Sequence, residues 1–270
     1  MMRNSDFLRA VLLSALLLLL PAAAPAADDT VTNSIGMTFV RIPAGSFMMG
    51  SAPDEKLRNE SEEQQPVIIA EPFYMQTTEV TRAQWWAVMG KKWLFPRKGP
   101  GNMPVAGVSW HDCRRFVRKL NQMEAATYRL PTEAQWEYAC RAGTQTAYVW
   151  GDRIDCADAM FANSPIKADR CVPAVKSRGL APGRPAPVKS YAPNPWGLYD
   201  MHGNLWEWCR NCFDPSPEPG MEGNFECTRR VRRGGSWKSR AHHLRSANRA
   251  YAHPAVKFKT TGFRLIKEAP

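Results

Sequence analysis

The sequence predicts an α+β domain in which a few short helices pack against small sheets and much of the chain is loop. Three observations favour this fold class. The N-termini of three helices can be recognised from capping patterns, and short apolar runs are separated by Pro and Gly. The 270 residues also include 10 Trp and 22 Pro. On length alone the chain fits one large domain or two small ones. The Trp content indicates a heavily aromatic core.

Residues 1–27 predict a secretory signal peptide. Arg3 and Arg9 precede an apolar run at 10–20, and small residues follow at 21–27. A positive start, an apolar stretch and a small-residue exit are typical of such a peptide. The alternative is an uncleaved anchor, but the run is shorter than the roughly 20 residues that span a bilayer. We expect a periplasmic or secreted protein with one domain at residues 28–270.

The formal net charge of +11 favours acidic partners or anionic surfaces. Nucleic acid is not an expected partner, because the basic residues are scattered rather than interleaved with stacking aromatics. The densest cluster, Arg229, Arg230, Arg232 and Arg233, can equally be a solvated strand edge.

Three capping boxes mark the expected helices. Thr81, Ser109 and Thr132 each precede by three residues a side chain that can reach back, and helical apolar spacing follows each one. Gly90 and Gly143 predict the ends of the first and third helices.

Strands are expected at residues 37–42 and 47–49, joined as a hairpin through residues 43–45. Two further short strands are expected at 67–70 and 73–76. Residues 151–194 show little periodicity, and a loop this long is normally functional or pinned by a metal or a disulfide.

Seven cysteines in an exported chain predict disulfides and one remaining thiol. Cys156 and Cys171 close a short loop and are the best pair. Cys227 is expected to pair with Cys209 or Cys212. The Cys-x-x-Cys spacing at 209–212 could also indicate redox chemistry or half a zinc site, but it stands alone, so a structural disulfide is favoured.

Seven segments, in this order and spacing, resemble the formylglycine-generating-enzyme (sulfatase-modifying-factor) family over residues 33–267. They are NSIGMTFVRIPAGSFMMGS at 33–51, TEVT at 78–81, PVAGVSW at 104–110, YRLPTEAQWEY at 128–138, NPWGLYDMHGNLWEW at 194–208, RGGSW at 233–237 and GFR at 262–264. The resemblance implies a single domain with a much-modified C-type-lectin-like fold, often bound to calcium.

A calcium site is expected around residues 200–207. Asp200 and Glu207 flank a turn at 203–204, and two carboxylates with two backbone carbonyls suit Ca²⁺. The resemblance implies Asp200, Gly203, Leu205 and Glu207 as ligands, the middle two through backbone oxygen. In the alternative, Glu207 pairs with an Arg of the basic C-terminal third.

A second calcium site of the family would match Asn163 and Ser164. Its other half falls near Leu180, where the chain offers no acid, so this site is weakly supported.

The family's own reaction is not expected here. The resemblance implies two thiolates just after the Gly-Gly-Ser motif that bind copper(I), a soft metal that selects sulfur. Ser239 stands at the first position, and no cysteine follows Cys227. A hydroxyl is too hard and too weakly acidic to replace a thiolate, so copper is not an expected cofactor. The resemblance also places Ser246 opposite Cys140, which is then the odd thiol or pairs with Cys113.

Polar groups nevertheless gather where the reaction would occur. The candidate cleft residues are Ser236, Ser239, His242, His243, Arg245, Asn248 and Arg249, with Trp206 nearby. They can form a substrate pocket with a His as general base, a groove that binds a peptide or protein, or a set of residues that merely holds the fold. A His242–His243 metal pair is weaker still, since adjacent residues point to opposite sides of a strand and only His253 follows.

Two classes of function follow from the resemblance. Members without the cysteine pair include a TagR-like branch of periplasmic regulators of a kinase pathway in type VI secretion. They also include a PvdO-like branch that oxidises a siderophore chromophore. The missing copper ligands and the basic charge favour the binding regulator with a periplasmic or envelope protein partner. The His- and Arg-containing cleft favours an oxidoreductase with a small-molecule substrate.

Overall fold

The computed structural model describes residues 29–90, 100–213 and 228–269. The expected signal peptide at 1–27 lies outside these ranges. In the described ranges, none of the helices has the length and apolar character that crossing a membrane requires.

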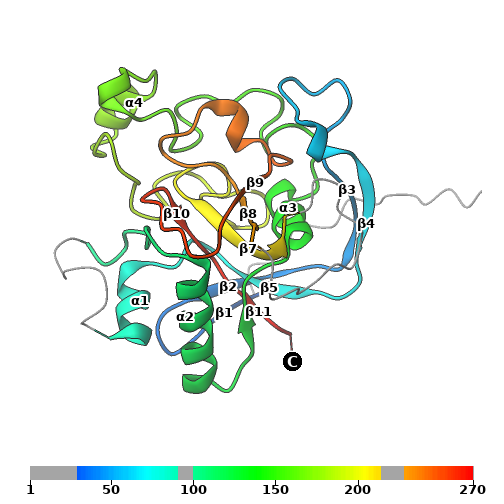
Figure 1. The fold of residues 1–270 in the computed structure, drawn as a ribbon, viewed down its shortest axis with the longest axis vertical. Helices are drawn as coiled ribbons and strands as arrows, with labels where there is room; N and C mark the ends of the chain where they lie inside the picture. The colour runs from blue at the N-terminus through cyan, green and yellow to red at the C-terminus, as the bar shows by residue number, and fades with distance from the viewer. Residues whose placement is uncertain (1–28, 91–99, 214–227, 270) are drawn as a thin grey trace, which may run out of the picture.

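The largest sheet joins the two ends of the described chain. Its five strands run in the order β1-β2-β5-β11-β6, and every neighbouring pair is antiparallel. The strands are β1 (Thr30–Thr32), β2 (Thr38–Ile42), β5 (Phe73–Gln76), β11 (Ile266–Lys267) and β6 (Tyr128–Arg129). The C-terminal strand therefore sits between two earlier ones (Figure 1).

A second sheet of four strands carries the site region. Its order is β10-β7-β8-β9, from β10 (Thr261–Gly262), β7 (Trp206–Cys212), β8 (Arg230–Arg233) and β9 (Ala250–Ala252). β10 and β7 are parallel, and the other pairs are antiparallel.

The expected hairpin at 37–49 is wrong, although both of its strands exist. β3 (Gly45–Met49) pairs with β4 (Gln65–Ile69) in a separate two-stranded sheet. The reason is that β1 and β5 occupy both edges of β2, so β2 has no free edge to offer β3.

All three predicted capping boxes are present. The side chains of Thr81, Ser109 and Thr132 each accept a hydrogen bond from the third helical residue, whose side chain returns to the cap backbone. They begin α1 (Arg82–Met89), α2 (Trp110–Met123) and α3 (Glu133–Arg141). Gly90 caps the end of α1 with φ of 80°, whereas the C-cap of α3 is Ala142, in the left-handed conformation, and not the expected Gly143.

Aromatic side chains fill the core, as the composition predicts. Trp85 on α1 stacks on Phe116 of α2 at 5.4 Å between ring centroids, and Phe263 meets Phe116 edge-on at 5.4 Å. A second cluster behind α3 contains Trp136 and Trp196. In Figure 1, α1 and α2 lie at one end of the molecule, and α4 (Val172–Ser177) lies away from them near the other end. The expected α+β class, with few helices and several small sheets, is confirmed.

The long loop at 151–194 is pinned by a disulfide, as expected. Cys156 and Cys171 are bonded across a separation of 15 residues. Two backbone hydrogen bonds also tie this loop to the site region, from Ala162 N to Ser239 O and from Asn163 N to Trp237 O, both at 2.9 Å.

The other cysteine predictions are partly wrong. Cys212 is disulfide-bonded, Cys209 is a buried free thiol, and Cys227 lies outside the described residues. Cys113 and Cys140 are also free, so three thiols rather than one remain in the described ranges. Cys113 and Cys140 cannot pair because they belong to different core clusters, one beneath α2 and one beneath α3.

The arginine cluster at 229–233 is not a solvated edge. Its residues 230–233 form β8, which lies between β7 and β9. Arg233 is completely buried and forms ion pairs with Glu133 and Glu137 of α3. This segment is therefore buried because Arg233 pairs with carboxylates that are distant in the sequence, which the local pattern of charges does not reveal.

Candidate functional site

The Gly-Gly-Ser turn after β8 forms the floor of the site region. Gly235 has φ of +76°, and a Cβ there would lie 2.7 Å from Leu244 Cδ1 and 3.0 Å from the His243 carbonyl oxygen. Only glycine therefore lets residues 241–244 approach so closely. The backbone N–H of Gly203 donates to the Gly234 carbonyl at 2.8 Å, which fastens this turn to the 200–205 loop.

Ser236 and Ser239 are hydrogen-bonded to each other. Their Oγ atoms lie 3.0 Å apart, and the Ser236 backbone N–H donates to Ser239 Oγ at 3.0 Å. In the described part of the chain, neither hydroxyl has a hydrogen bond to a histidine, so no Ser–His nucleophile pair is formed. At the position where the family resemblance implies a thiolate, the oxygen of Ser239 instead closes a turn.

His242 and His243 lie on a short 3₁₀ helix (Ala241–Leu244), with ring centroids 4.0 Å apart. The expectation that they point to opposite sides is wrong because they are helical rather than extended. His243 also lies 6.3 Å from the Trp206 ring, which confirms that Trp206 is close. Burial is the main reason that the pKa of His242 is lowered, and the positive charge of Arg245 lowers it further. Burial likewise lowers the pKa of His243, with a smaller contribution from the neighbouring His242. Both imidazoles are therefore neutral at pH 7.

Arg245, Asn248 and Arg249 hold the fold rather than line a cleft. Arg245 donates to Glu62 at 2.6 and 2.9 Å and to Glu55 at 2.6 Å. Asn248 donates to Glu62, and Arg249 makes two bonds to Glu133, at 2.8 and 2.9 Å. The bonds to Glu55 and Glu62 fasten the segment between β3 and β4 onto the site region, and the bonds to Glu133 fasten the start of α3.

Glu207 in the expected calcium loop is already partnered. Its carboxylate accepts two hydrogen bonds from Arg264, at 2.7 and 2.8 Å, and one from Trp136 Nε1 at 2.8 Å. The predicted alternative, in which Glu207 pairs with an Arg of the C-terminal third, is therefore present. Three hydrogen bonds still leave one carboxylate lone pair unused.

A third carboxyl group, Glu79, joins this region and was missed by the sequence reasoning. Glu79 is completely buried, and its Oε1 accepts from Asn204 Nδ2 at 3.0 Å. Its other oxygen, Oε2, has no hydrogen-bond donor and lies close to Asp200, so a Glu79 carboxyl group that keeps its proton would donate it to the Asp200 carboxylate. Burial, then the charges of Asp200 and Glu207, holds the pKa of Glu79 well above its usual range. The only hint was its place in the TEVT segment.

Asp200 and its loop have an unusual backbone. Asp200, Gly203 and Asn204 have φ of +60°, +109° and +56°, conformations that redirect successive carbonyl groups. Asp200 accepts a hydrogen bond from the Lys189 backbone at 3.0 Å, and burial raises its pKa to about 6. Within the described ranges, no three His, Cys, Asp or Glu side chains converge as a metal cage, so any cation here would need backbone oxygens.

At the second expected calcium position, the amide nitrogen of Asn163 has protein partners, whereas its Oδ1, the atom that could bind a cation, is buried without one. Asn163 Nδ2 donates to Met160 Sδ and to the Arg184 carbonyl, and the Asn163 carbonyl accepts from Gly183 N. The backbone N–H of Ser164 donates to Asp169.

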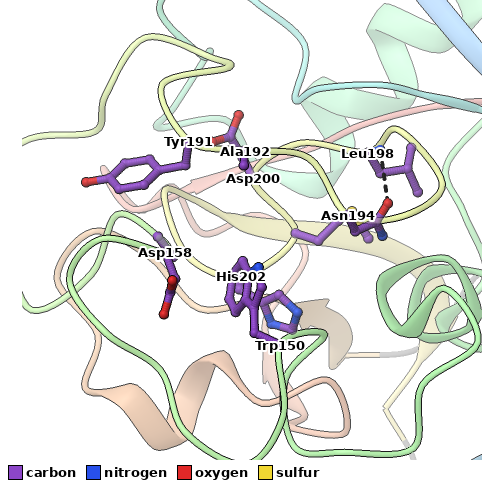
Figure 2. A pocket seen from close by; sticks show the side chains of 10 residues that line it. Trp150, Asp158, Tyr191, Ala192, Asn194, Leu198, Asp200 and His202 are labelled. Carbon is purple, nitrogen blue, oxygen red and sulfur yellow. Dashed lines mark hydrogen bonds between the residues drawn. The ribbon is translucent and has the colours of Figure 1, made fainter.

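A small pocket lies beside Asp200. Figure 2 shows the His202 and Trp150 side chains together, with Asp158, Tyr191 and Asp200 to one side of them. The pocket offers about 10 Å³ to the centre of a water molecule, so it holds about one water and no organic substrate.

The thiol of Cys140 lies close to His202, which lines this pocket. His202 Nε2 is 3.6 Å from Cys140 Sγ, and Ser246 Oγ is 3.8 Å from it, which confirms that Ser246 stands opposite Cys140. Burial raises the pKa of Cys140 to about 12 and lowers that of His202 to about 4. At pH 7 the pair is therefore a neutral thiol beside a neutral imidazole.

Together, these features define a class of protein: a single loop-rich α+β domain whose Gly-Gly-Ser turn, tryptophan-rich loop and C-terminal Gly-Phe-Arg segment converge on one region. A family model described as "Sulfatase-modifying factor enzyme 1-like domain" matches residues 26–269. The chain belongs to this family, that of the formylglycine-generating enzymes.

Individual relatives agree with this assignment. The chain is 31% identical to a formylglycine-generating enzyme of Streptomyces coelicolor, over 85% of this chain and 89% of that enzyme. It is 34% identical over 182 residues to "Serine/threonine-protein kinase pkn1" of Chlamydia caviae, where the match covers 64% of this chain but only 25% of the kinase. In fold it resembles the structure of PvdO from Pseudomonas aeruginosa, with a TM-score of 0.76, 24% identity, and coverage of 92% of this chain and all of that one.

Proposed function

We propose that this protein is an exported member of the family that no longer forms formylglycine and acts as a regulatory or accessory protein by binding an envelope partner, as TagR does. The main support for the proposal is the presence of a serine, Ser239, where the family resemblance implies a cysteine. Its hydroxyl replaces the first copper-binding thiolate and is hydrogen-bonded within its own turn.

No other thiol in the described ranges can take over copper binding. Cys113, Cys140 and Cys209 are all buried, and burial raises the pKa of each thiol. Copper(I) requires thiolates that are deprotonated and reachable. Purified protein should therefore neither retain Cu(I) nor convert the cysteine of a sulfatase-derived peptide. Conversion of that peptide would refute the loss of the ancestral reaction.

Two observations support regulation. The similarity to part of a serine/threonine kinase of Chlamydia caviae indicates that this kind of domain is combined with kinase signalling in another protein. The net charge of +11 suits an acidic protein surface. We propose that the protein is periplasmic and contacts the periplasmic domain of an envelope protein in a kinase pathway.

The test is crosslinking in intact cells followed by binding measurements with the purified pair. Binding should saturate and weaken as salt screens surface charges. If no envelope protein is captured reproducibly, the regulatory proposal fails.

A second function, a periplasmic oxidoreductase resembling PvdO, is favoured by one observation. His242 and His243 are neutral, half-buried and adjacent to Trp206, so an imidazole could accept a proton from a phenolic or catecholic substrate. Turnover of such a substrate should then drop at least about a hundredfold in a His242→Ala, His243→Ala double variant. Unchanged turnover would remove the assigned role.

We also propose a structural Ca²⁺ at the 200–207 loop, held by Asp200, the carbonyl groups of Gly203 and Leu205, and the free lone pair of Glu207. The buried carboxyl groups of Glu79 and Asp200 fit this proposal, because burial raises the pKa of both and a cation beside Asp200 would favour their ionised forms. The ion would supply charge and rigidity.

The calcium test is thermal unfolding with EDTA and with excess Ca²⁺. Saturation at about a hundred times Kd should stabilise the protein by about 2.7 kcal/mol. Asp200→Asn should remove most of this gain, and Glu79→Gln should reduce it. An equal gain in all three proteins would exclude this site.

A further inference from the structure

A line of neighbouring aromatic and cationic side chains runs across the four-stranded sheet. We call it the Arg232 strip: His243, Trp206 at the start of β7, Arg232 in β8, and Phe258 between β9 and β10. The Arg232 guanidinium lies 5.7 Å from the Trp206 ring and 4.7 Å from the Phe258 ring. On its other side, Trp206 lies 6.3 Å from His243.

Arg232 differs from the buried arginines around it, because it has no carboxylate partner in the described ranges. Arg233, Arg245, Arg249 and Arg264 each form an ion pair with a glutamate. Arg232 donates instead to Thr261 Oγ1 at 3.0 Å and to the Tyr251 carbonyl at 3.1 Å. These bonds use two of its five N–H groups, and Nε is buried without a partner.

The cation of Arg232 is nevertheless retained at neutral pH. Burial lowers its pKa to about 10, well above 7, so the guanidinium stays charged while it loses part of its hydration. A partly desolvated cation without a counter-ion is an unfavourable arrangement that a bound carboxylate would relieve.

The surroundings of the strip are basic as well. Residues 228–267 contain no Asp or Glu. Exposed Lys238 and Arg240 precede His243, and exposed Lys259 follows Phe258. In the described ranges none of these three cations has an ion pair, so an anionic ligand would be attracted from both ends of the strip. The nearby acid Asp112 of α2 is already paired with Lys257, at 2.9 Å.

We propose that the Arg232 strip is the face that binds the envelope partner, and that it recognises an acidic, extended segment of that protein. One carboxylate would dock on Arg232, while apolar side chains of the segment pack on Trp206 and Phe258. This inference rests on the regulatory function proposed above. Arginine beside tryptophan is typical of the composition of protein-interface hot spots. A membrane surface is disfavoured because Arg232 is recessed among rings instead of protruding.

The test is fluorescence anisotropy of the purified protein with two labelled peptides of equal length. One alternates Glu with Leu and Phe, and the other carries Gln in place of each Glu. The acidic peptide should bind, the Gln peptide should not, and about 1 M salt should abolish binding. Arg232→Gln should weaken binding by about tenfold or more, since a charged hydrogen bond is lost. The matched control is Lys119→Gln, which removes one exposed charge on α2 and should change little.

Three outcomes would overturn the strip proposal. These are no binding of the acidic peptide, equal weakening by Lys119→Gln, or binding of anionic lipid vesicles that Arg232→Gln abolishes while the peptide stays unbound. Phe258→Ala serves as a second variant, because its side chain is 37% exposed and its loss should not disturb folding. It should also weaken peptide binding.

Crosslinking in cells distinguishes a failure of the strip proposal from a failure of the proposed regulatory function. If the wild-type protein captures a partner and Arg232→Gln captures it equally well, regulation stands and the strip is wrong. If the wild-type protein captures no partner, the regulatory function fails.

Discussion

Replacing Arg264 with Met should destabilise this protein more than removing any exposed ion pair. Arg264 is completely buried and makes two hydrogen bonds to Glu207, and it also donates to the carbonyl of Tyr199 at 2.8 Å. Glu79 and Asp200 add negative charge to the same region. Met fills a similar volume but leaves Glu207 with only Trp136 as a donor.

The expected cost is about 4 kcal/mol, because removing one partner of a buried ion pair typically costs about 3–5 kcal/mol. In a domain of this size each kcal/mol lowers Tm by roughly 2–4 °C, so Tm should fall by about 8–16 °C. Adding Glu207→Gln to Arg264→Met should recover part of the loss, since the uncompensated charge disappears.

The assay is urea unfolding followed by tryptophan fluorescence, with Glu268→Gln as the control. Glu268 pairs with Arg129 at the surface, with side chains 48% and 23% exposed, so its change should cost at most about 1 kcal/mol. If Arg264→Met costs no more than this control, or if Glu207→Gln deepens the loss, the charge-compensation argument is refuted.

Three further predictions concern other parts of the fold. Removing the disulfide by Cys156→Ser with Cys171→Ser should lower the unfolding free energy by about 3 kcal/mol, because the bond closes a 15-residue separation; an unchanged urea midpoint would contradict this. Thr132→Ala should cost about 1 kcal/mol in the same assay through loss of the α3 cap, and Thr132→Ser should restore most of it. The pKa of His202 falls from 6.5 to about 4 on folding, so the unfolded state binds the proton more readily, and stability should be lost as pH falls from about 6.5 to 4. The loss between pH 7 and 4.5 should be about 2 kcal/mol larger in the wild type than in His202→Gln, and equal losses would exclude this role.

Local chemistry accounts for what could be predicted from the sequence. The caps at Thr81, Ser109 and Thr132 were predictable because a capping box involves only four consecutive residues. The Cys156–Cys171 bond was predictable because the loop that it closes is short. The loss of the thiolate at Ser239 needed only the family's motif order and the residue that stands there.

Tertiary structure decided what depends on distant partners. Arg245 meets Glu62 across 183 residues, and Glu207 meets Arg264 across 57, so no local pattern could show that these charges are neutralised in the interior. The pairing of β3 with β4 depended on which edges of β2 were already occupied. Glu79 and the Arg232 strip emerged for the same reason: a side chain's lack of a partner depends on the whole fold around it, whereas capping and loop closure depend only on near neighbours in the chain.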